Sequence, residues 1–182
     1  MLKKLLIMLL LSSAIFSLEN QSALSETGET EDFTVIKKSF ADGFYKISSE
    51  QLDGFIKDYP ISNKTTESHL LLGISLYHLQ NYDKAAFEFE YLVNSAGGNL
   101  FEDETLYWLG ETYRMKGNFQ DSLEYLQTLI DKFPDSKFLK HAYYSKGFCL
   151  FNEGDYSKAL DVFEEFLKSY PEDNSVLQDA KF

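Results

Sequence analysis

The sequence predicts an all-α protein, a solenoid of about four helix-turn-helix repeats. Three observations predict this fold class. A pattern of glycine, aromatic and small residues recurs every 37 residues. Within each copy, apolar residues are spaced by three and four positions, as on one face of an α-helix. Proline closes several copies, where a helix cannot continue. A fixed period of roughly 20 to 50 residues is typical of solenoids, in which each unit buries its apolar face against its neighbours.

The register of the four copies is set by their turn residues, Gly43, Gln80, Gly117 and Gly154, which are evenly spaced. An aromatic residue follows each of them two positions later, and a small residue follows three positions after that. Nearly the same pattern therefore occurs four times without a slip in spacing.

Each copy contains two predicted helices. In the third copy, Leu106, Leu109 and Tyr113 form the apolar face of the first helix. The second helix begins at Asn118, because Asn there can accept hydrogen bonds from the free N–H groups of a new helix, as Asn81 and Asp155 can in other copies. It ends before Pro134.

A glycine interrupts the first helix in three copies, at Gly73, Gly110 and Gly147. Glycine inside a helix costs about 1 kcal/mol relative to alanine. Its recurrence predicts a close helix crossing at this position, where a side chain would not fit. The first copy has Ile36 there instead.

This combination of residues resembles the tetratricopeptide repeat, over residues 33–182 and most fully from Thr105 to Pro134. The resemblance implies a right-handed solenoid that binds protein or peptide partners on its concave face. Departures from the family pattern are Gln80 for the turn glycine, Ser122 for alanine and Lys146 for an apolar residue. The second copy also runs into NSAGGN instead of proline, so we expect a looser junction with the third.

The N-terminal residues resemble an export signal. Residues 1–18 combine Lys3 and Lys4, a short apolar run and small residues, which is the layout of a signal peptide; a membrane anchor is the alternative. Residues 19–32 are acidic and contain few apolar residues, so we expect a flexible leader. The repeat domain is then 33–182, and we expect the protein to cross the inner membrane into the periplasm, with no direct membrane insertion after signal cleavage.

With this N-terminus, the repeats are similar to those of bacterial envelope proteins, such as the periplasmic coordinator of the Tol-Pal system and the outer-membrane β-barrel assembly lipoprotein. At the other end, Val176, Leu177 and Ala180 fall on the apolar positions of a further first helix. Either a short helix caps the last repeat, or the chain is the front of a longer protein. There are two alternatives to an envelope scaffold. The chain is the front module of an envelope enzyme, or it is a repeat protein that self-assembles into a homo-oligomer.

Composition argues against several other functions. The formal net charge of −12 repels phosphate backbones, so no nucleic-acid partner is expected. The single cysteine, Cys149, lies in an apolar helical run, so we expect its thiol to be buried. His69, His78 and His141 have no second ligand at helical spacing. With no nucleophile motif or phosphate loop in the sequence, we expect a protein that is not an enzyme and uses no metal or cofactor.

The candidate binding residues are those that the resemblance places on the concave groove, with three first helices contributing at spacings i, i+4 and i+7. They are Leu70, Ile74, Tyr77, Tyr107, Glu111, Arg114, Tyr144, Phe148 and Phe151. Burial of these side chains by packing between repeats is the alternative. If they are exposed, the aromatic groove favours an apolar segment or amphipathic helix as ligand, with Glu111 and Arg114 setting its register. The groove lacks the Lys/Asn/Arg clamp with which some relatives bind a terminal carboxylate.

Overall fold

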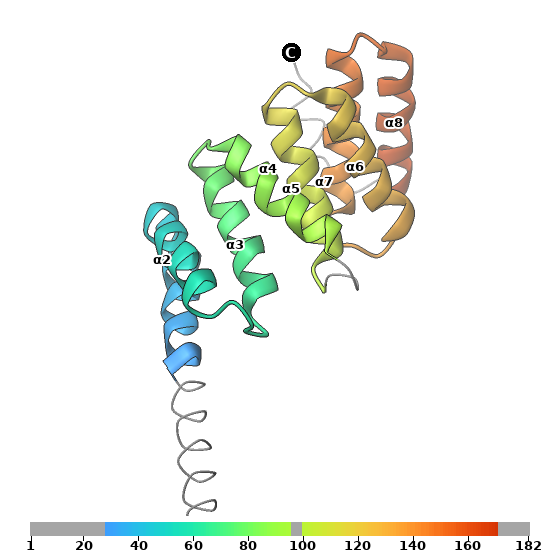
Figure 1. The fold of residues 1–182 in the computed structure, drawn as a ribbon. Coiled ribbons are helices and arrows are strands. Elements are labelled where there is room, and N and C mark those ends of the chain that lie inside the picture. The colour runs from blue at the N-terminus through green and yellow to red at the C-terminus, as the bar shows by residue number, and fades with distance from the viewer. Residues whose placement is uncertain (1–27, 96–99, 171–182) are drawn as a thin grey trace, which may run out of the picture.

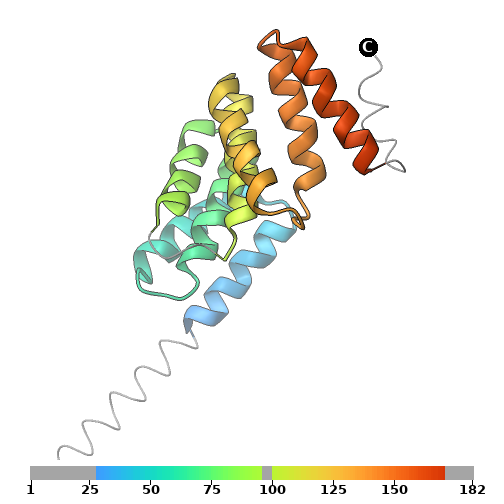
Figure 2. The same ribbon diagram turned by 90° about the vertical axis from the view of Figure 1, so that its right-hand side faces the viewer.

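The computed structural model describes residues 28–95 and 100–170. Over these residues the chain forms helices and no strand: a first helix at 28–41, then α2 (Tyr45–Asp58), α3 (Thr65–His78), α4 (Tyr82–Asn94), α5 (Glu102–Met115), α6 (Phe119–Lys132), α7 (Leu139–Asn152) and α8 (Tyr156–Ser169). Each helix packs on the next along the chain, and the hairpins stack in order with the first helix and α8 at opposite ends (Figures 1 and 2). The predicted all-α solenoid is confirmed.

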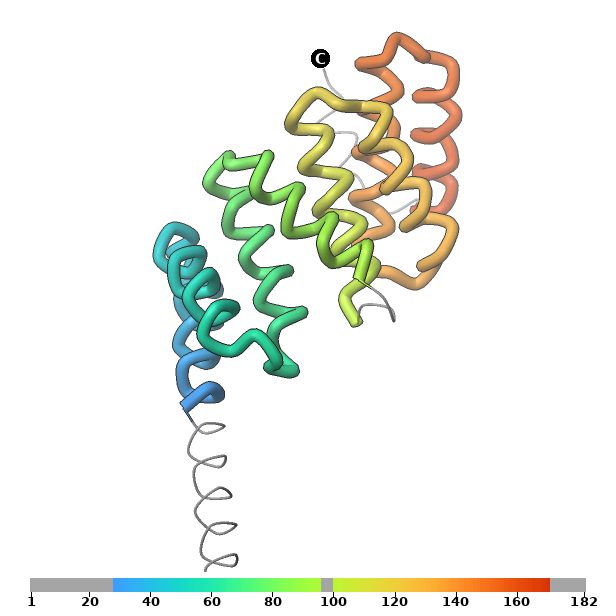
Figure 3. Tube along the Cα trace, viewed as in Figure 1, coloured from blue at the N-terminus to red at the C-terminus, as the bar shows by residue number. Residues whose placement is uncertain are grey.

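Four hairpins make up this array. The first helices of the repeats are 28–41, α3, α5 and α7, and the second helices are α2, α4, α6 and α8; the Cα trace reverses direction at each turn (Figure 3). Three of the expected segments lie outside the described residues: the signal peptide, leader residues 19–27 and the apolar positions after Pro171. No helix in the described part of the chain is long and apolar enough to cross a membrane.

The turn within each hairpin has the same geometry, with a left-handed residue after the first helix. The φ angle is +78° at Gly43 and Gly117 and +83° at Gly154, a region that glycine enters without strain. Gln80 adopts φ +60°. Two backbone hydrogen bonds close each turn, such as Gln80 N–H to Tyr77 C=O and Asn81 N–H to Leu76 C=O in repeat two. The left-handed position is therefore imposed by the fold even where its residue is not glycine.

The expected N-cap residues occupy the N-cap positions, but only one makes the capping bond. The Asp155 carboxylate accepts a hydrogen bond from the Lys158 backbone N–H at 3.3 Å. It also pairs with the Lys158 Nζ at 2.6 Å, so a charge holds it in place. Asn81 and Asn118 make no such side-chain bond.

The mid-helix glycines mark close crossings between the two helices of a hairpin, as predicted. A Cβ atom at Gly110 would lie 2.8 Å from the Leu126 side chain, and one at Gly73 or Gly147 would lie 2.5 Å from a phenyl ring on the second helix. Real Cβ atoms do not approach neighbours this closely. The crossing therefore excludes a side chain in repeats two to four.

Odd and even repeats differ in a regular way. The small residue of the second helix is Ser48 or Ser122 in repeats one and three, and alanine in repeats two and four. Each serine hydroxyl meets a polar group on the next first helix: Ser48 lies 3.0 Å from Ser75, and Ser122 lies 3.3 Å from Cys149. A polar contact between side chains therefore recurs at every second junction of the described array.

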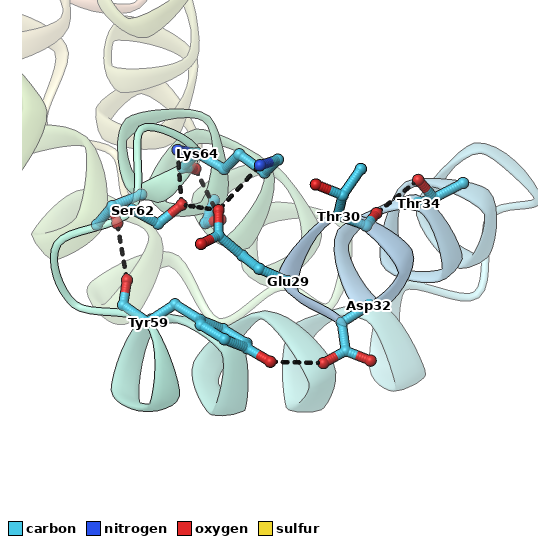
Figure 4. A network of polar contacts seen from close by, with 9 residues as sticks. Glu29, Thr30, Asp32, Thr34, Tyr59, Ser62 and Lys64 are labelled. Atoms are coloured by element: carbon cyan, nitrogen blue, oxygen red, sulfur yellow. Dashed lines mark hydrogen bonds and ion pairs between the residues drawn. The ribbon is translucent and has the colours of Figure 1, made fainter. Parts of the chain in front are cut away.

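A second bond recurs at the same two junctions. Ser62, in the loop before α3, donates to Glu29 at 2.6 Å, and two periods later Ser136 donates to Asp103 at 2.7 Å. Lys64 adds an ion pair to Glu29 at 2.9 Å (Figure 4). The loop that follows each odd repeat is therefore tied to the first helix of that repeat.

These contacts correct the expected boundary of the repeat domain. Residues 28–32 were expected in the flexible leader but are helical, and Asp32 accepts a hydrogen bond from the Tyr59 hydroxyl at 3.0 Å (Figure 4). The acidic composition is compatible with order because Ser62, Lys64 and Tyr59, some 30 residues away in the chain, supply the partners. The folded region begins by residue 28 rather than 33.

Candidate functional site

The first helices form one layer, because α5 contacts both α3 and α7 in addition to its hairpin partner α6. Side chains from three consecutive hairpins therefore meet along this layer, which we call the inner face. A second helix, by contrast, is separated from the next second helix by the first helix between them. The inner face is thus the surface on which one ligand can reach several repeats at once.

Aromatic rings cross the inner face in an unbroken series of contacts. Trp108 on α5 is its centre, with ring centroids 5.1 Å from Tyr77, 5.8 Å from His78 and 5.3 Å from Tyr107. The series continues at one end from His78 to Tyr45, stacked at 4.1 Å, and at the other from Tyr107 to Phe138, stacked at 4.8 Å. We call these six residues the aromatic strip: Tyr45, Tyr77, His78, Tyr107, Trp108 and Phe138. Except for the exposed His78, they are half-buried, so the rings keep part of their surface open to solvent.

An ion pair lies beside the strip. The Arg114 Nε and Nη2 donate to the two carboxylate oxygens of Glu111 at 3.1 and 2.7 Å. The side chains are 20% and 7% exposed, respectively. Arg114 also lies 5.2 Å from the centroid of the Phe148 ring on α7. This two-bond geometry with a ring on the other side fixes the guanidinium group.

Burial and the ion pair shift several pKa values on this face. Burial raises the pKa of Tyr77 to about 12, and the negative charge of Glu111 adds to the shift. Burial also raises the pKa of Tyr107. For Arg114, burial acts to lower the pKa, but the hydrogen bond and charge of Glu111 prevail and raise it. Partial burial lowers the pKa of His78. At neutral pH the tyrosines are therefore uncharged, and Arg114 is charged and paired.

The structure brings together five of the nine predicted binding residues. Tyr77, Tyr107, Glu111, Arg114 and Phe148 lie in mutual contact or share a neighbour around the ion pair and the strip. Phe148 is 37% exposed, so a ligand can reach its ring.

The other four lie elsewhere. Leu70 and Ile74 are buried in the core cluster around Phe89, so they offer no binding surface, and for them the alternative of burial by packing holds. The prediction placed them in the groove because their helix stripe also faces the core. Tyr144 packs toward Phe163 of its own hairpin, at 6.4 Å. Phe151 is 57% exposed and contacts Tyr156 at the α8 end of the array.

Comparisons with known proteins identify the family of two of the repeats. Residues 104–136 and 141–173 each match a model described as tetratricopeptide repeat. These two segments are tetratricopeptide repeats, and the described helices form a solenoid of that type. No curated protein matches it. A tetratricopeptide solenoid is a scaffold for protein–protein interaction, and this fold is typically non-enzymatic.

Solved tetratricopeptide structures share the fold at low sequence identity. "MamA 41-end from Desulfovibrio magneticus RS-1" is 18% identical with a TM-score of 0.69, over 81% of this chain and 78% of that chain. YrrB, titled "a TPR protein with an unusual peptide-binding site", is 17% identical with a TM-score of 0.63, over 80% and 70%. A Podosopora anserina putative kinesin light chain with TPR-like repeats is 10% identical with a TM-score of 0.64, over 78% and 74%. At these identities the likeness shows the fold alone.

Four strip residues were missed by the sequence analysis: Tyr45, His78, Trp108 and Phe138. The tetratricopeptide register was correct, but the assumed groove stripe included Tyr107 and omitted its neighbour Trp108, although both rings belong to the strip. The available signal was composition, because Trp108 is the only tryptophan in the chain. Its Nε1 is buried and has no hydrogen-bond partner among the described residues.

Two other features of the described residues bear on the choice of site. They contain no group of three histidine, cysteine, aspartate or glutamate residues able to hold a metal ion. A cavity of about 640 Å³ lies by Glu29 and the loop from Asp58 to Lys64. No strip residue lines it, and four of its lining residues, Glu29, Tyr59, Ser62 and Lys64, belong to the polar network of Figure 4. The inner face therefore remains the candidate site, on the strength of its aromatic contacts.

Proposed function

We propose that this protein is an exported interaction scaffold whose inner face binds an apolar or amphipathic segment of a partner protein. The observation that carries the proposal is the aromatic strip, because its half-exposed rings cross from α2 to the residue before α7. Aromatic residues in partly open, well-packed positions commonly dominate binding energy at protein interfaces. A segment lying along the strip would contact three hairpins.

The strip is already organised for binding. Its rings support one another through the contacts from Tyr45 to Phe138, so a ligand would not have to order them. The Glu111–Arg114 pair beside it is internally neutralised, which suits a ligand whose central part is apolar. YrrB, a TPR protein with a peptide-binding site, has a similar fold, which supports a peptide as the ligand.

The cellular setting of this proposal comes from the sequence. The lysines and apolar run of residues 1–18 support export, and we place the function in assembly or maintenance of the cell envelope. Fusing residues 1–32 to alkaline phosphatase, which is active only after export, tests this. We expect phosphatase activity outside the inner membrane, and its absence there would refute the export part of the proposal.

The binding part is tested with Tyr107→Ala/Phe148→Ala. The protein lacking residues 1–27 and the double variant are used as bait in envelope extract of the source organism, with circular dichroism and melting measured in parallel. We expect retained helix content and loss of most of the captured partner, since anchor aromatics contribute about 2 kcal/mol or more each. Phe87→Ala, on the exposed outer side of α4, is the matched control. Equal capture by a folded double variant would exclude this face; if the double variant unfolds, Phe148→Ala alone decides.

Self-assembly is a second candidate, favoured by the α8 end of the array. Phe151, Tyr156 and Leu160 are large, apolar and exposed there. In repeat three, the residue equivalent to Leu160 is Leu123, which packs on the cluster of Leu150 in the next hairpin. A second copy covering this end would bury the same position. Light scattering on the wild type and on Leu160→Glu tests it: a dimer that the variant dissociates supports self-assembly, and a wild-type monomer at high concentration excludes it.

A further inference from the structure

The chemistry of the aromatic strip bears on the kind of segment that it binds. An aromatic face carries partial negative charge and attracts cations placed over it. The strip offers such faces from several hairpins, with Trp108, the strongest type of ring for this contact, at its centre. The inference that follows rests on the proposed binding function of this face.

The protein itself places cations over rings on this layer. The Arg114 guanidinium carbon lies 5.2 Å from the Phe148 centroid, and the Lys137 Nζ lies 4.7 Å from the Phe138 centroid. Both distances fall within the range of about 6 Å at which the attraction is significant. Cations and rings are therefore compatible neighbours in this environment.

Three bases on or next to the first helices are each neutralised by an acid. Arg114 is bound to Glu111, Lys137 pairs with Glu104 at 3.3 Å, and Lys37 of the first helix pairs with Glu67 at 2.7 Å. Each base is thus matched by one acid from a first helix. The lowered pKa of His78 keeps its imidazole neutral at pH 7.

The charge of the whole chain acts in the same direction. A formal net charge of −12 attracts cationic ligands over distances of the order of the Debye length, about 8 Å at physiological salt. The net charge at long range and the aromatic rings at contact distance both favour a positively charged ligand. We propose that the segment bound by the inner face carries lysine or arginine side chains that lie over the aromatic strip.

Three synthetic peptides test the proposal on the protein lacking residues 1–27. One is an amphipathic helix of leucine and lysine, and its twins carry glutamine or glutamate in place of every lysine. Binding is measured by fluorescence anisotropy at 0.1 M and 0.5 M salt. We expect the lysine peptide to bind about tenfold more tightly than the glutamine twin, and to keep most of this advantage at high salt, where long-range attraction is screened.

Trp108→Leu and Tyr77→Leu are the deciding variants, because each keeps an apolar side chain and removes a ring. We expect either change to reduce the advantage of the lysine peptide to threefold or less while the glutamine twin binds within about threefold of its wild-type affinity. Phe87→Leu, which removes an exposed ring from the outer side of α4, serves as the control and should leave all three affinities unchanged. Circular dichroism confirms folding, and Tyr77→Leu decides if Trp108→Leu does not fold.

The outcomes separate this inference from the proposed function. If the three peptides bind alike and all weaken in the ring variants, the inner face is a binding site without a charge preference, and the inference is wrong. If the lysine advantage disappears at 0.5 M salt, it comes from net charge alone, which also overturns the inference. If neither ring variant weakens any peptide, the binding function of this face fails as well.

Discussion

The hydroxyl groups of Ser48 and Ser75 lie 3.0 Å apart in the buried junction between repeats one and two, where both side chains are fully buried. One hydroxyl donates to the other, whose own proton goes to a carbonyl of its helix, at Tyr45 or Leu71. Either serine can still donate to its own helix carbonyl when its partner is removed, but the hydrogen bond across the junction needs both hydroxyl groups. The pair therefore specifies which helix packs against which.

Removing one partner should destabilise the protein. We expect Ser48→Ala to lower the free energy of unfolding by about 1 kcal/mol, measured by urea denaturation. Adding Ser75→Ala should cost less than a second independent loss, because the hydrogen bond across the junction is already absent from the single variant. Ser49→Ala, where the hydroxyl is exposed, is the control. Additive losses in the double variant would show that the two hydroxyl groups are not coupled.

The helix crossing predicts a large effect at Gly110. A leucine there must displace Leu126, so we expect Gly110→Leu to lower stability by about 1–3 kcal/mol in thermal or urea unfolding. Gly54, in α2, has no atom within 4 Å of an added Cβ, so Gly54→Ala should instead stabilise the protein by up to about 1 kcal/mol through helix propensity. A Gly110→Leu protein that melts with the wild type would contradict the crossing.

The turn of repeat two predicts a stabilising change. Gln80 holds φ +60°, which costs a residue with a Cβ roughly 1–2 kcal/mol. Gln80→Gly should relieve this strain, but glycine also loses more conformational entropy on folding. We therefore expect the free energy of unfolding to rise by about 0.5–1 kcal/mol. The reverse change at the equivalent site, Gly117→Gln, should be destabilising. Equal unfolding midpoints for all three proteins would show that the turn carries no strain.

Alkaline pH should weaken the fold through its buried thiol and phenol groups. Burial raises the pKa of Cys149 from 9.0 to about 11 and those of Tyr77 and Tyr143 from 10.0 to about 12. A raised pKa means that the folded state retains the proton longer than the unfolded state does. The stability that these neutral groups contribute is therefore complete below pH 9 and is lost as pH rises from 9 to 12.

Urea midpoints between pH 8 and pH 11.5 measure this loss. We expect the midpoint to be level near pH 8 and to fall above pH 9. Tyr143→Phe removes one of the titrating hydroxyls and should make the fall shallower above pH 10. A midpoint that is constant to pH 11.5, or a variant with an unchanged slope, would contradict the assignment.

Much of the fold could be predicted from the sequence, because each repeat of a solenoid shows the same residue pattern again. The turn positions, the crossing at Gly110 and the end of α6 before Pro134 each followed from a residue type that only one local structure accommodates. The start of the domain could not be predicted in this way, since the order of Glu29 depends on Ser62, more than thirty residues later.

The candidate site was only partly predictable for a different reason. Equivalent positions of the helical stripe do not have the same surroundings in every repeat. Leu70 lies in the core, whereas Tyr107, one period later at the equivalent position, belongs to the aromatic strip together with its neighbour Trp108. Which side of the stripe stays open depends on how the hairpins pack, and that is a property of the assembled array.

The alternation of odd and even repeats implies that the modular unit of this chain is the pair of hairpins. Excising residues 63–136 would place Ser48 against Cys149, the partner that its equivalent Ser122 has now. Ser62 would likewise take the position of Ser136 and keep Glu29 as its acceptor. Recombination that adds or removes whole pairs thus preserves these polar contacts, whereas a shift by one hairpin would set Ser48 opposite Thr112, which carries a methyl group that Ser75 and Cys149 lack. Lineages of such a protein should change length in steps of two repeats.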